Sequence, residues 1–296
     1  MDQTSDHKAL IASLPPDLRS RLTQPSTTAG LLHLAGHLSA IAVTTTLIAT
    51  PFWPIALLVQ GILLIFLFTL EHEATHRTPF ANAALNDWVG STCGLILFLP
   101  FEWFRYFHLA HHRHTNLPGL DPELDGPKPE SLRQWITHVS GIPYWTAEIK
   151  LLLSLALNRS QSAYIPQNAL PRIVAEARIM LALYAAAAAS FAVTPALLWF
   201  WLIPILLGQP FLRLYLLAEH GDCPYVANML ENTRTTFTNR IVRFLAWNMP
   251  YHTEHHAYPA VPFHQLPALH HEIRAHLKVT AKGYASFTRA YLSRHR

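Results

Sequence analysis

The stretch IALLVQGILLIFLFTLEHEATH, residues 55–76, joins a long apolar run to a pair of closely spaced histidines. Its first part, from about Ile55 to Leu70, is apolar and approaches the ~20 residues that a helix needs to cross a bilayer. The apolar run stops at Glu71, and His72 and His76 follow it at once. The stretch therefore predicts a membrane-spanning helix whose end carries side chains that can bind a metal ion.

The composition of the whole chain favours lipid as its main solvent. Hydrophobic residues make up 51% of the 296 residues and charged residues only 14%, whereas a soluble domain carries about 25% charged residues. The net charge of +4 is spread over several segments, which argues against a nucleic-acid-binding surface. The two cysteines, Cys93 and Cys223, cannot supply the four ligands of an iron–sulfur cluster.

Further apolar segments predict an all-α integral membrane protein with four transmembrane helices in two hairpins. Neither hairpin turn carries Lys or Arg, whereas the segments at the opposite end carry many. By the positive-inside rule these segments, which we expect to form a helical cap, face the cytoplasm. The predicted divisions of this single domain are an N-terminal segment (1–28), a first hairpin (30–70), a loop (72–175), a second hairpin (179–218) and a tail (222–296).

The loop holds two further predicted elements. A short apolar stretch, residues 88–104, lies between Asp87 and Arg105 and is predicted to be an interfacial or re-entrant segment that returns to the side it left. A surface helix is predicted near residues 145–157. This organisation keeps the loop and the tail on one side of the membrane, which we expect to be the cytoplasmic side.

Histidine is unusually abundant, with 19 copies. Eight of them form three clusters at ligand-like spacings, and His220 adds a fourth site. In a helix, positions i, i+3 and i+4 share one face, so each cluster offers its imidazoles together. All the clusters follow predicted spans or lie in the tail, so they can meet at one membrane surface. The predicted metal ligands are His72, His76, His108, His111, His112, His220, His252, His255 and His256.

Nine imidazoles exceed the needs of one ion, since zinc takes about four ligands, and they indicate two ions. Imidazole suits zinc, copper, iron and nickel alike, so the ligands do not name the metal. Nearby carboxylates are candidates to orient ligating imidazoles through their other N–H. These candidates are Asp121, Glu219, Glu73, Glu123 and Glu254, and Asn248 is a candidate to bind a metal-bound water.

Other readings of single motifs are weaker. His33 and His37 lie inside the first predicted span, where packing or pocket lining is favoured over ligation. Residues 72–76 also form HExxH, the zinc protease signature, and 124–126 read LDG, but a protease would leave seven histidines unexplained. A metal transporter would need polar groups along a route through the membrane, and the predicted spans carry few.

The histidine pattern resembles that of the membrane fatty acid desaturase and hydroxylase superfamily. That pattern is HX3–4H, then two HX2–3HH boxes, with one further histidine before the last box. Here it reads His72-X3-His76, His108-X2-His111-His112 and His252-X2-His255-His256, with His220 as the additional histidine. Flanking residues are similar too: 114–116 (HTN), 121–123 (DPE), 248–252 (NMPYH), 258–259 (YP), and 232–236 (NTRTT), which is similar to short bacterial members.

The resemblance implies four transmembrane helices, two iron ions, O2 as co-substrate and a separate electron donor of the ferredoxin, rubredoxin or cytochrome b5 type. It implies a desaturase that introduces a C=C bond into an acyl lipid or similar amphiphilic chain, and the similarity to short bacterial members implies a bacterial inner membrane. A hydroxylase of the same superfamily is the alternative, because both reactions begin with removal of a hydrogen atom. The chain carries no HPGG haem-binding motif of a fused cytochrome b5 domain.

Overall fold

Helices dominate residues 6–126, 128–160 and 162–295, which are the residues that the computed structural model describes. Two strands of two residues each, β1 (Thr235–Thr236) and β2 (Thr280–Ala281), pair in parallel and link the middle of the tail to its end. The predicted all-α class is therefore confirmed.

Four helical segments are long and apolar enough to cross a membrane, as predicted. Several of their large apolar side chains point outward, among them Leu32 with 70% of its surface exposed and Ile179 with 60%. Such exposure is costly in water but not in lipid. The segments comprise α3 (Thr27–Ile48), α4 (Trp53–Ile65) continued by α5 (Leu67–Thr75), α10 (Leu170–Ser190), and the π-helical turn η2 (Leu198–Leu202) continued by α11 (Ile203–His220).

The third of these helices begins earlier than hydropathy predicts, at Leu170 rather than near residue 179. Its first turns are polar, and contacts with α7 (Phe101–His114) account for that polarity. Arg172 pairs with Glu102, and the Glu176 carboxylate accepts the Glu102 backbone N–H at 2.8 Å. Polar pairing thus extends the helix beyond its apolar part.

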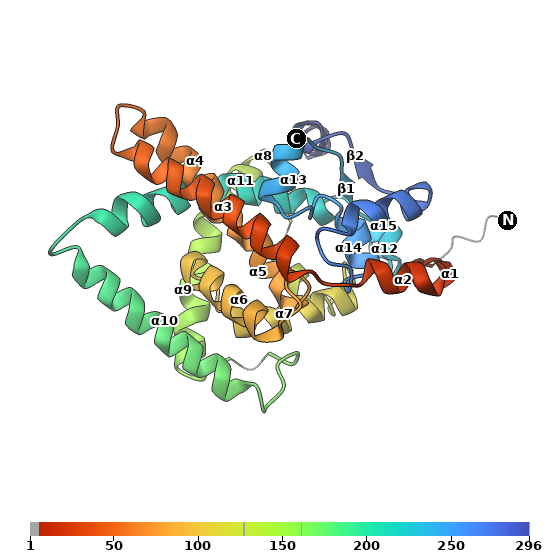
Figure 1. The fold of residues 1–296 in the computed structure, drawn as a ribbon, viewed down its shortest axis with the longest axis horizontal. Coiled ribbons are helices and arrows are strands. Elements are labelled where there is room, and N and C mark those ends of the chain that lie inside the picture. Colours follow the sequence, from red (N-terminus) through yellow and green to blue (C-terminus); the bar gives the residue numbers. More distant parts are fainter. Residues whose placement is uncertain (1–5, 127, 161, 296) are drawn as a thin grey trace.

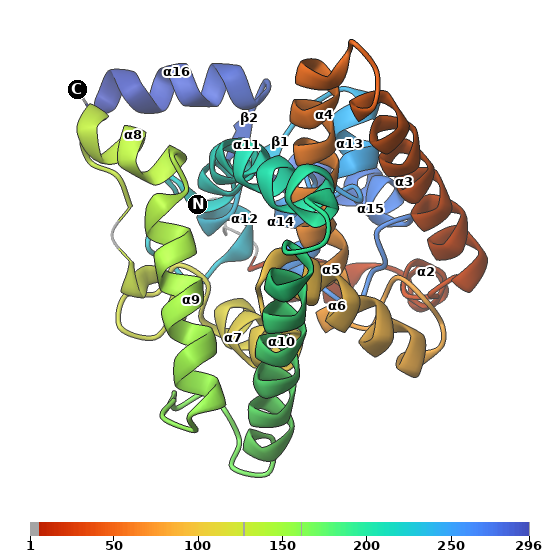
Figure 2. The same ribbon diagram turned by 90° about the vertical axis from the view of Figure 1, so that its left-hand side faces the viewer.

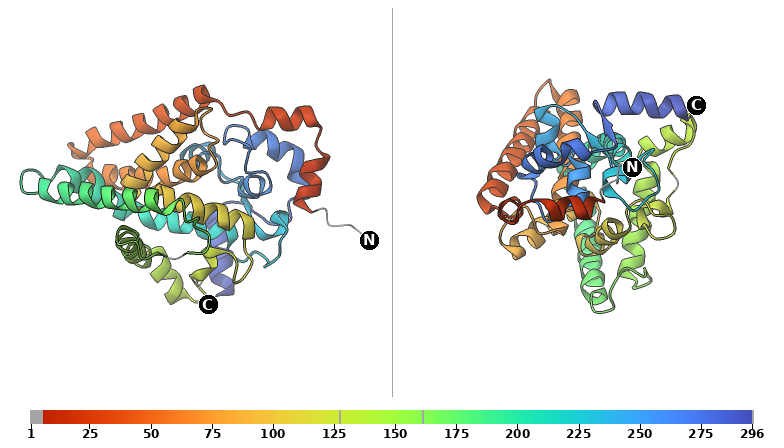
Figure 3. Two further views of the ribbon diagram at one scale, coloured as in Figure 1. Left: turned by 90° about the horizontal axis from the view of Figure 1, so that it is seen from below. Right: turned by 90° about the vertical axis from the view of Figure 1, so that its right-hand side faces the viewer.

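The turns that join the long helices lie together at one end of the molecule, away from the C-terminal segments (Figure 1; left panel of Figure 3). The C-terminal segments, drawn in blue, gather at the opposite end with the N-terminal helices α1 (His7–Ser13) and α2 (Pro16–Leu22). Figure 2 shows α9 (Ile142–Ala156) and α10 beside each other, with α16 (Tyr284–Arg294) crossing above them. α9 corresponds to the surface helix that was predicted near residues 145–157.

Two glycines bring α4 and α11 into backbone contact. A Cβ atom added to Gly61 would lie 2.1 Å from the carbonyl oxygen of Pro204, and one added to Gly208 would lie 2.1 Å from that of Gly61. Gly61 precedes His72 by 11 residues and Gly208 precedes His220 by 12, so both histidines lie about 17–18 Å further along their helices. The contact therefore sets the two histidines at similar heights.

The predicted interfacial stretch forms two helices, α6 (Ala83–Leu97) and α7, bent by 100° at residues 98–100. Phe98 ends α6 in the left-handed conformation with φ 63°, and Pro100 caps the start of α7. A pair between Asp87 on α6 and Arg105 on α7 spans the bend. Such a bend is what a segment that returns to its own side requires.

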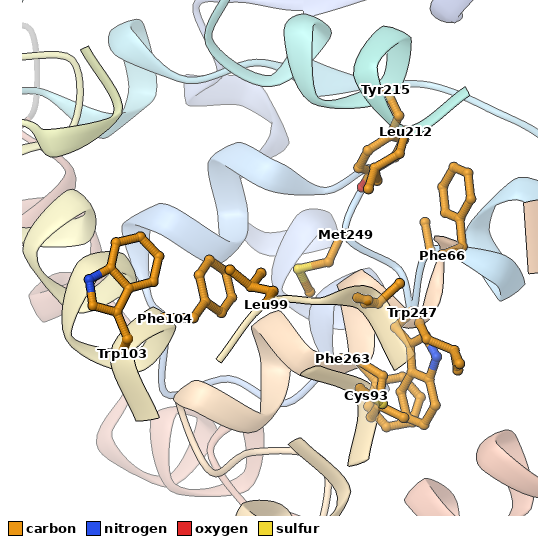
Figure 4. Close-up of a cluster of buried hydrophobic side chains, with 14 of the residues drawn as sticks. Phe66, Cys93, Leu99, Trp103, Phe104, Leu212, Tyr215, Trp247, Met249 and Phe263 are labelled. Carbon is orange, nitrogen blue, oxygen red and sulfur yellow. The ribbon is translucent and has the colours of Figure 1, made fainter. Parts of the chain in front are cut away.

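The core beneath the histidines is rich in aromatic side chains from several elements. Figure 4 shows Trp103, Phe104 and Leu99 on one side and Trp247 beside Phe263 on another. The remaining elements are η1 (Pro122–Asp125), α8 (Leu132–Val139), α12 (Met229–Asn232), α13 (Arg240–Leu245), α14 (His252–Ala257), α15 (Leu266–Ile273) and η3 (Arg274–His276).

Candidate metal centre

The nine predicted ligands meet in one place, although they come from four separate helices, α5, α7, α11 and α14. Their nitrogen atoms form two groups, and within each group the atoms lie within 4.8 Å of one another. His252 adjoins the second group, with its Nε2 atom 3.1 Å from that of His220. The first group is His72, His76, His108, His112 and His255, and the second is His111, His220 and His256.

The helix that carries the third histidine box is held by hydrogen bonds on the side away from the histidines. Thr253 donates to the carbonyl oxygen of Thr233 at 2.9 Å, and Thr235 donates to Glu254 at 2.6 Å. The same carboxylate group also pairs with His270. Glu254, predicted to orient a ligand, instead bonds to two residues outside the predicted ligand set and fixes α14.

Pairs of imidazoles approach one another through the nitrogens that would bind metal. The Nε2 atoms of His72 and His255 are 2.8 Å apart, and those of His76 and His108 are 2.9 Å apart. Two imidazole nitrogens bound at about 2.1 Å and at right angles on one ion would be about 3 Å apart. The Nε2 atom of His256 is buried without a hydrogen-bond partner. This donor set fits metal ions.

In the second group, each of the three imidazoles has an oxygen atom close to Nδ1, the ring nitrogen that points away from the other ligands. His111 faces Asp121 at 2.9 Å from its Nδ1 atom, so Asp121 lies where it was predicted to act. The Nδ1 atom of His256 lies 3.1 Å from the Thr115 hydroxyl, and that of His220 lies 3.2 Å from the Asn232 carbonyl. Partners of this kind direct the Nε2 lone pair of a ligand toward the metal.

Two further carboxylates face ligands at longer range. Glu73 lies 3.6 Å from Nδ1 of His255, and Glu219 lies 3.4 Å from Nδ1 of His252. All four of these atoms are buried and lack hydrogen-bond partners, so they form two facing but loose pairs. Glu123, with 40% of its side chain exposed, is 3.6 Å from Nδ1 of His111.

Burial keeps His76 and the three histidines of α14 neutral. It lowers the pKa of His76 to about 3 and the pKa values of His252, His255 and His256 well below the ordinary value. Neutral imidazole is the form that binds metal. For Asp121, burial alone would raise the pKa, but the hydrogen bond with His111 contributes to a net lowering. Its carboxylate is therefore charged at neutral pH.

A cavity of about 300 Å³ opens beside the histidines. Its walls include His72 and His108 together with the apolar side chains of Leu99, Trp103 and Phe104. A substrate in this cavity would lie against the candidate metal ligands, with little room for water at the apolar wall.

Three polar residues singled out from the sequence bind the backbone. The side chain of Asn248 donates to the Phe263 carbonyl at 3.0 Å, and Asn248 has a left-handed backbone with φ 59°. His33 lies 2.7 Å from the Phe244 carbonyl and His37 lies 2.8 Å from the Leu63 carbonyl, which is the packing role expected for both.

Thr115 and Asn232 were not identified from the sequence as partners of the ligands. Asn232 acts through its carbonyl oxygen, which its identity does not reveal, and Thr115 has no ligand-like spacing. Both lie in the flanking motifs 114–116 and 232–236, and those motifs were the available signal.

Comparison with known proteins gives consistent matches. A family model described as fatty acid desaturase matches residues 49–288. A mouse sphingolipid delta(4)-desaturase/C4-monooxygenase is 28% identical over 204 residues, covering 66% of this chain and 58% of that protein. An acyl-lipid 8-desaturase of Rebecca salina is 25% identical, covering 71% and 54%. An sn-1 oleoyl-lipid 12-desaturase of Synechocystis is 25% identical, covering 75% and 68%. This chain thus spans little more than half the length of the first two relatives.

Proposed function

Because the chain belongs to the fatty acid desaturase family, we propose that it is an O2-dependent di-iron desaturase that introduces a C=C bond into an acyl lipid or similar amphiphilic chain. The observation that carries this proposal is the convergence of histidine nitrogens into two adjacent groups beside a cavity. Two groups suit two ions, and imidazole is a suitable ligand for iron.

The nine histidines are proposed to hold the two ions, with His252 joining the second group. When bound, iron supplies the activation of O2 and the removal of hydrogen from an unactivated carbon. Burial keeps His76 and the imidazoles of the third box neutral, and Asp121 holds the ring of His111 in the orientation that ligation needs. Besides donating a hydrogen bond to the Phe263 carbonyl, Asn248 is proposed to hold a water near the site.

The apolar wall of the cavity is proposed to position the substrate's acyl chain for oxidation. Leu99, Trp103 and Phe104 would exclude water from the reacting carbons beside His72 and His108, which line the same cavity. Excluding water limits side reactions of a strong oxidant.

The chain is an integral membrane protein, as its four apolar helices and its family indicate. We propose that these helices form two hairpins, residues 30–70 and 179–218, within a single domain. The loop at 72–175 and the tail at 222–296 would cap the metal centre on the cytoplasmic side of a bacterial inner membrane. The absence of Lys and Arg from both turns supports this orientation.

The electrons are proposed to come from a separate protein of the ferredoxin, rubredoxin or cytochrome b5 type. The chain has two cysteines, too few for a cluster of its own. One relative, an omega-3 desaturase of Synechocystis, carries ferredoxin in its name.

Hydroxylation is the second candidate function. The mouse relative is named both a desaturase and a monooxygenase, so this family's scaffold accommodates both outcomes. A zinc protease is disfavoured because both carboxylate oxygens of Glu73, in the HExxH sequence, face protein groups. Oε2 accepts hydrogen bonds from the Thr78 hydroxyl at 2.9 Å and the Phe263 N–H at 3.1 Å, and Oε1 faces Nδ1 of His255 at 3.6 Å. A general base would need to face a metal-bound water instead.

Metal analysis tests the proposal. Full-length protein expressed with ample iron and purified in detergent should hold about two iron ions per chain, because two groups of imidazoles are available. It should also convert an acyl lipid or a similar amphiphile to a product with one more double bond when O2 and a reduced donor are supplied. Stoichiometric zinc without iron would contradict the proposal.

A further inference from the structure

The cavity beside the histidines ends in charged groups rather than in an apolar wall. Arg213 of α11, Glu148 of α9 and His138 of α8 all line it. Each has a buried polar atom without a hydrogen-bond partner: Nε of Arg213, Oε2 of Glu148 and Nε2 of His138. Buried polar atoms are almost always paired, so three unpaired atoms in one cavity call for a ligand.

The opposite charges do not neutralise one another directly. In the part of the chain that the structure describes, no ion pair within 4.0 Å involves Arg213 or Glu148. The guanidinium instead lies over the ring of Tyr144, 4.3 Å from its centre, and this contact leaves its N–H donors free. One turn earlier on α11, Gln209 is fully buried, and both polar atoms of its amide are unpaired.

The chemistry of these groups is that of a site for two opposite charges. Burial raises the pKa of Glu148 to about 7, and Arg213 opposes that rise. An anion alone would be attracted by Arg213 but repelled by the ionised form of Glu148. A ligand with both charges would pair with both residues at once.

We propose that this end of the cavity binds a zwitterionic headgroup, with a carboxylate on Arg213 and an ammonium group on Glu148. The inference rests on the proposed function and names its substrate class: an amphiphile of the amino-acid type, rather than a chain joined through an ester or thioester.

The distance along α11 indicates how long the substrate is. Arg213 precedes His220 by seven residues, which is about 10 Å of helix. An extended chain advances about 3.5 Å for every three bonds, so roughly nine bonds cover this distance. A cavity of about 300 Å³ is at the lower end of the range for small-molecule sites. A chain of about eight carbons would therefore reach from Arg213 to the histidines.

Calorimetric titration of the full-length protein in detergent tests the headgroup directly. The probes are 2-aminooctanoic acid, octanoic acid and octylamine, which differ only in their charged groups. We expect 2-aminooctanoic acid to bind at least about tenfold more tightly than either other probe, because each lacks one charge-assisted contact. Glu148→Gln should remove the preference over octanoic acid, and Arg213→Gln the preference over octylamine.

Arg133→Gln on α8 and Lys150→Gln on α9 change exposed charges nearby and should retain the preference. If Arg213→Gln cannot be purified folded, the isosteric Glu148→Gln decides alone. Equal or tighter binding of octanoic acid, saturation by none of the probes, or an unchanged preference in Glu148→Gln would overturn the inference. Iron measured in the same preparations separates the outcomes: iron without headgroup preference rejects this inference alone, and preference without iron rejects the proposed desaturase.

Discussion

The two groups of histidines differ in what lies behind the rings. In the second group, His111, His220 and His256 each have an oxygen atom within 3.2 Å of Nδ1. In the first group, Nδ1 of His112 is buried without a partner, and Nδ1 of His255 lies 3.6 Å from Glu73. The second group is therefore oriented before any metal arrives, whereas the first depends more on contacts among its own imidazoles.

One histidine pattern can therefore form two metal sites whose ligands differ in how firmly they are oriented. Ligands oriented by outer hydrogen bonds lose less freedom when a metal binds, so the second group should bind its ion more tightly. Single substitutions can separate the two groups, because His255 and His256 are neighbours in the chain but belong to different groups.

Loss of one ligand from either group should have the largest effect. His255→Ala and His256→Ala should each abolish product and lower the iron content from about two ions to about one per chain, while the protein still inserts in the membrane. Product assays and metal analysis on the purified variants check this. His271→Ala, at an exposed position, is the control. Full activity of His255→Ala would remove the third box from the site.

Loss of the Asp121 carboxylate, which faces His111, should have the second-largest effect. Asp121→Asn retains the shape of the side chain but removes its charge, so we expect metal affinity to fall about 10–100-fold. Competition with a chelator measures this, and Asp125→Asn at the exposed end of η1 serves as a matched control. Equal affinity in Asp121→Asn and Asp125→Asn would show that the second group does not need this partner.

The looser carboxylates should matter less. Glu73→Gln and Glu219→Gln should each lower metal affinity by less than about tenfold, because their contacts of 3.6 and 3.4 Å are too long for strong hydrogen bonds. Turnover should persist in Glu73→Gln when the protein is loaded with iron. A complete loss of turnover with the metal still bound would point to a proton-transferring role for Glu73 and favour the protease reading.

Removing the hydroxyl behind His256 should have the smallest effect of the four. Thr115→Val deletes a neutral hydrogen bond worth about 1 kcal/mol, which corresponds to a factor of about five in affinity. The same chelator competition measures it, with Thr137→Val on the exposed face of α8 as control. An effect as large as that of Asp121→Asn would mean that the charge behind His111 contributes nothing special.

Much of the fold and of the candidate centre could be predicted because both depend on local periodicity. Apolar runs predict the long helices, and spacings of three and four residues place imidazoles on one helical face. Glu254 was assigned the wrong partners for the same reason. It lies two residues after His252, about 200° around the helix, and so it points away from the ligands toward Thr235 and His270.

The charged end of the cavity could not be predicted. His138, Glu148 and Arg213 come from three helices that are distant in sequence, and none has a recognisable spacing. Each residue alone reads as an ordinary charge on a polar loop or near a helix end. Only the packing of α8 and α9 against α11 shows that they share one cavity.

The backbone contact between Gly61 and Gly208 also bears on how the protein responds to its lipid. A helix in a thicker or thinner bilayer adjusts by tilting, and two loosely packed helices would tilt by different amounts. Here the backbones of α4 and α11 touch, so the pair tilts as one rigid body and His72 stays level with His220. We therefore expect the geometry of the centre to tolerate changes in membrane thickness.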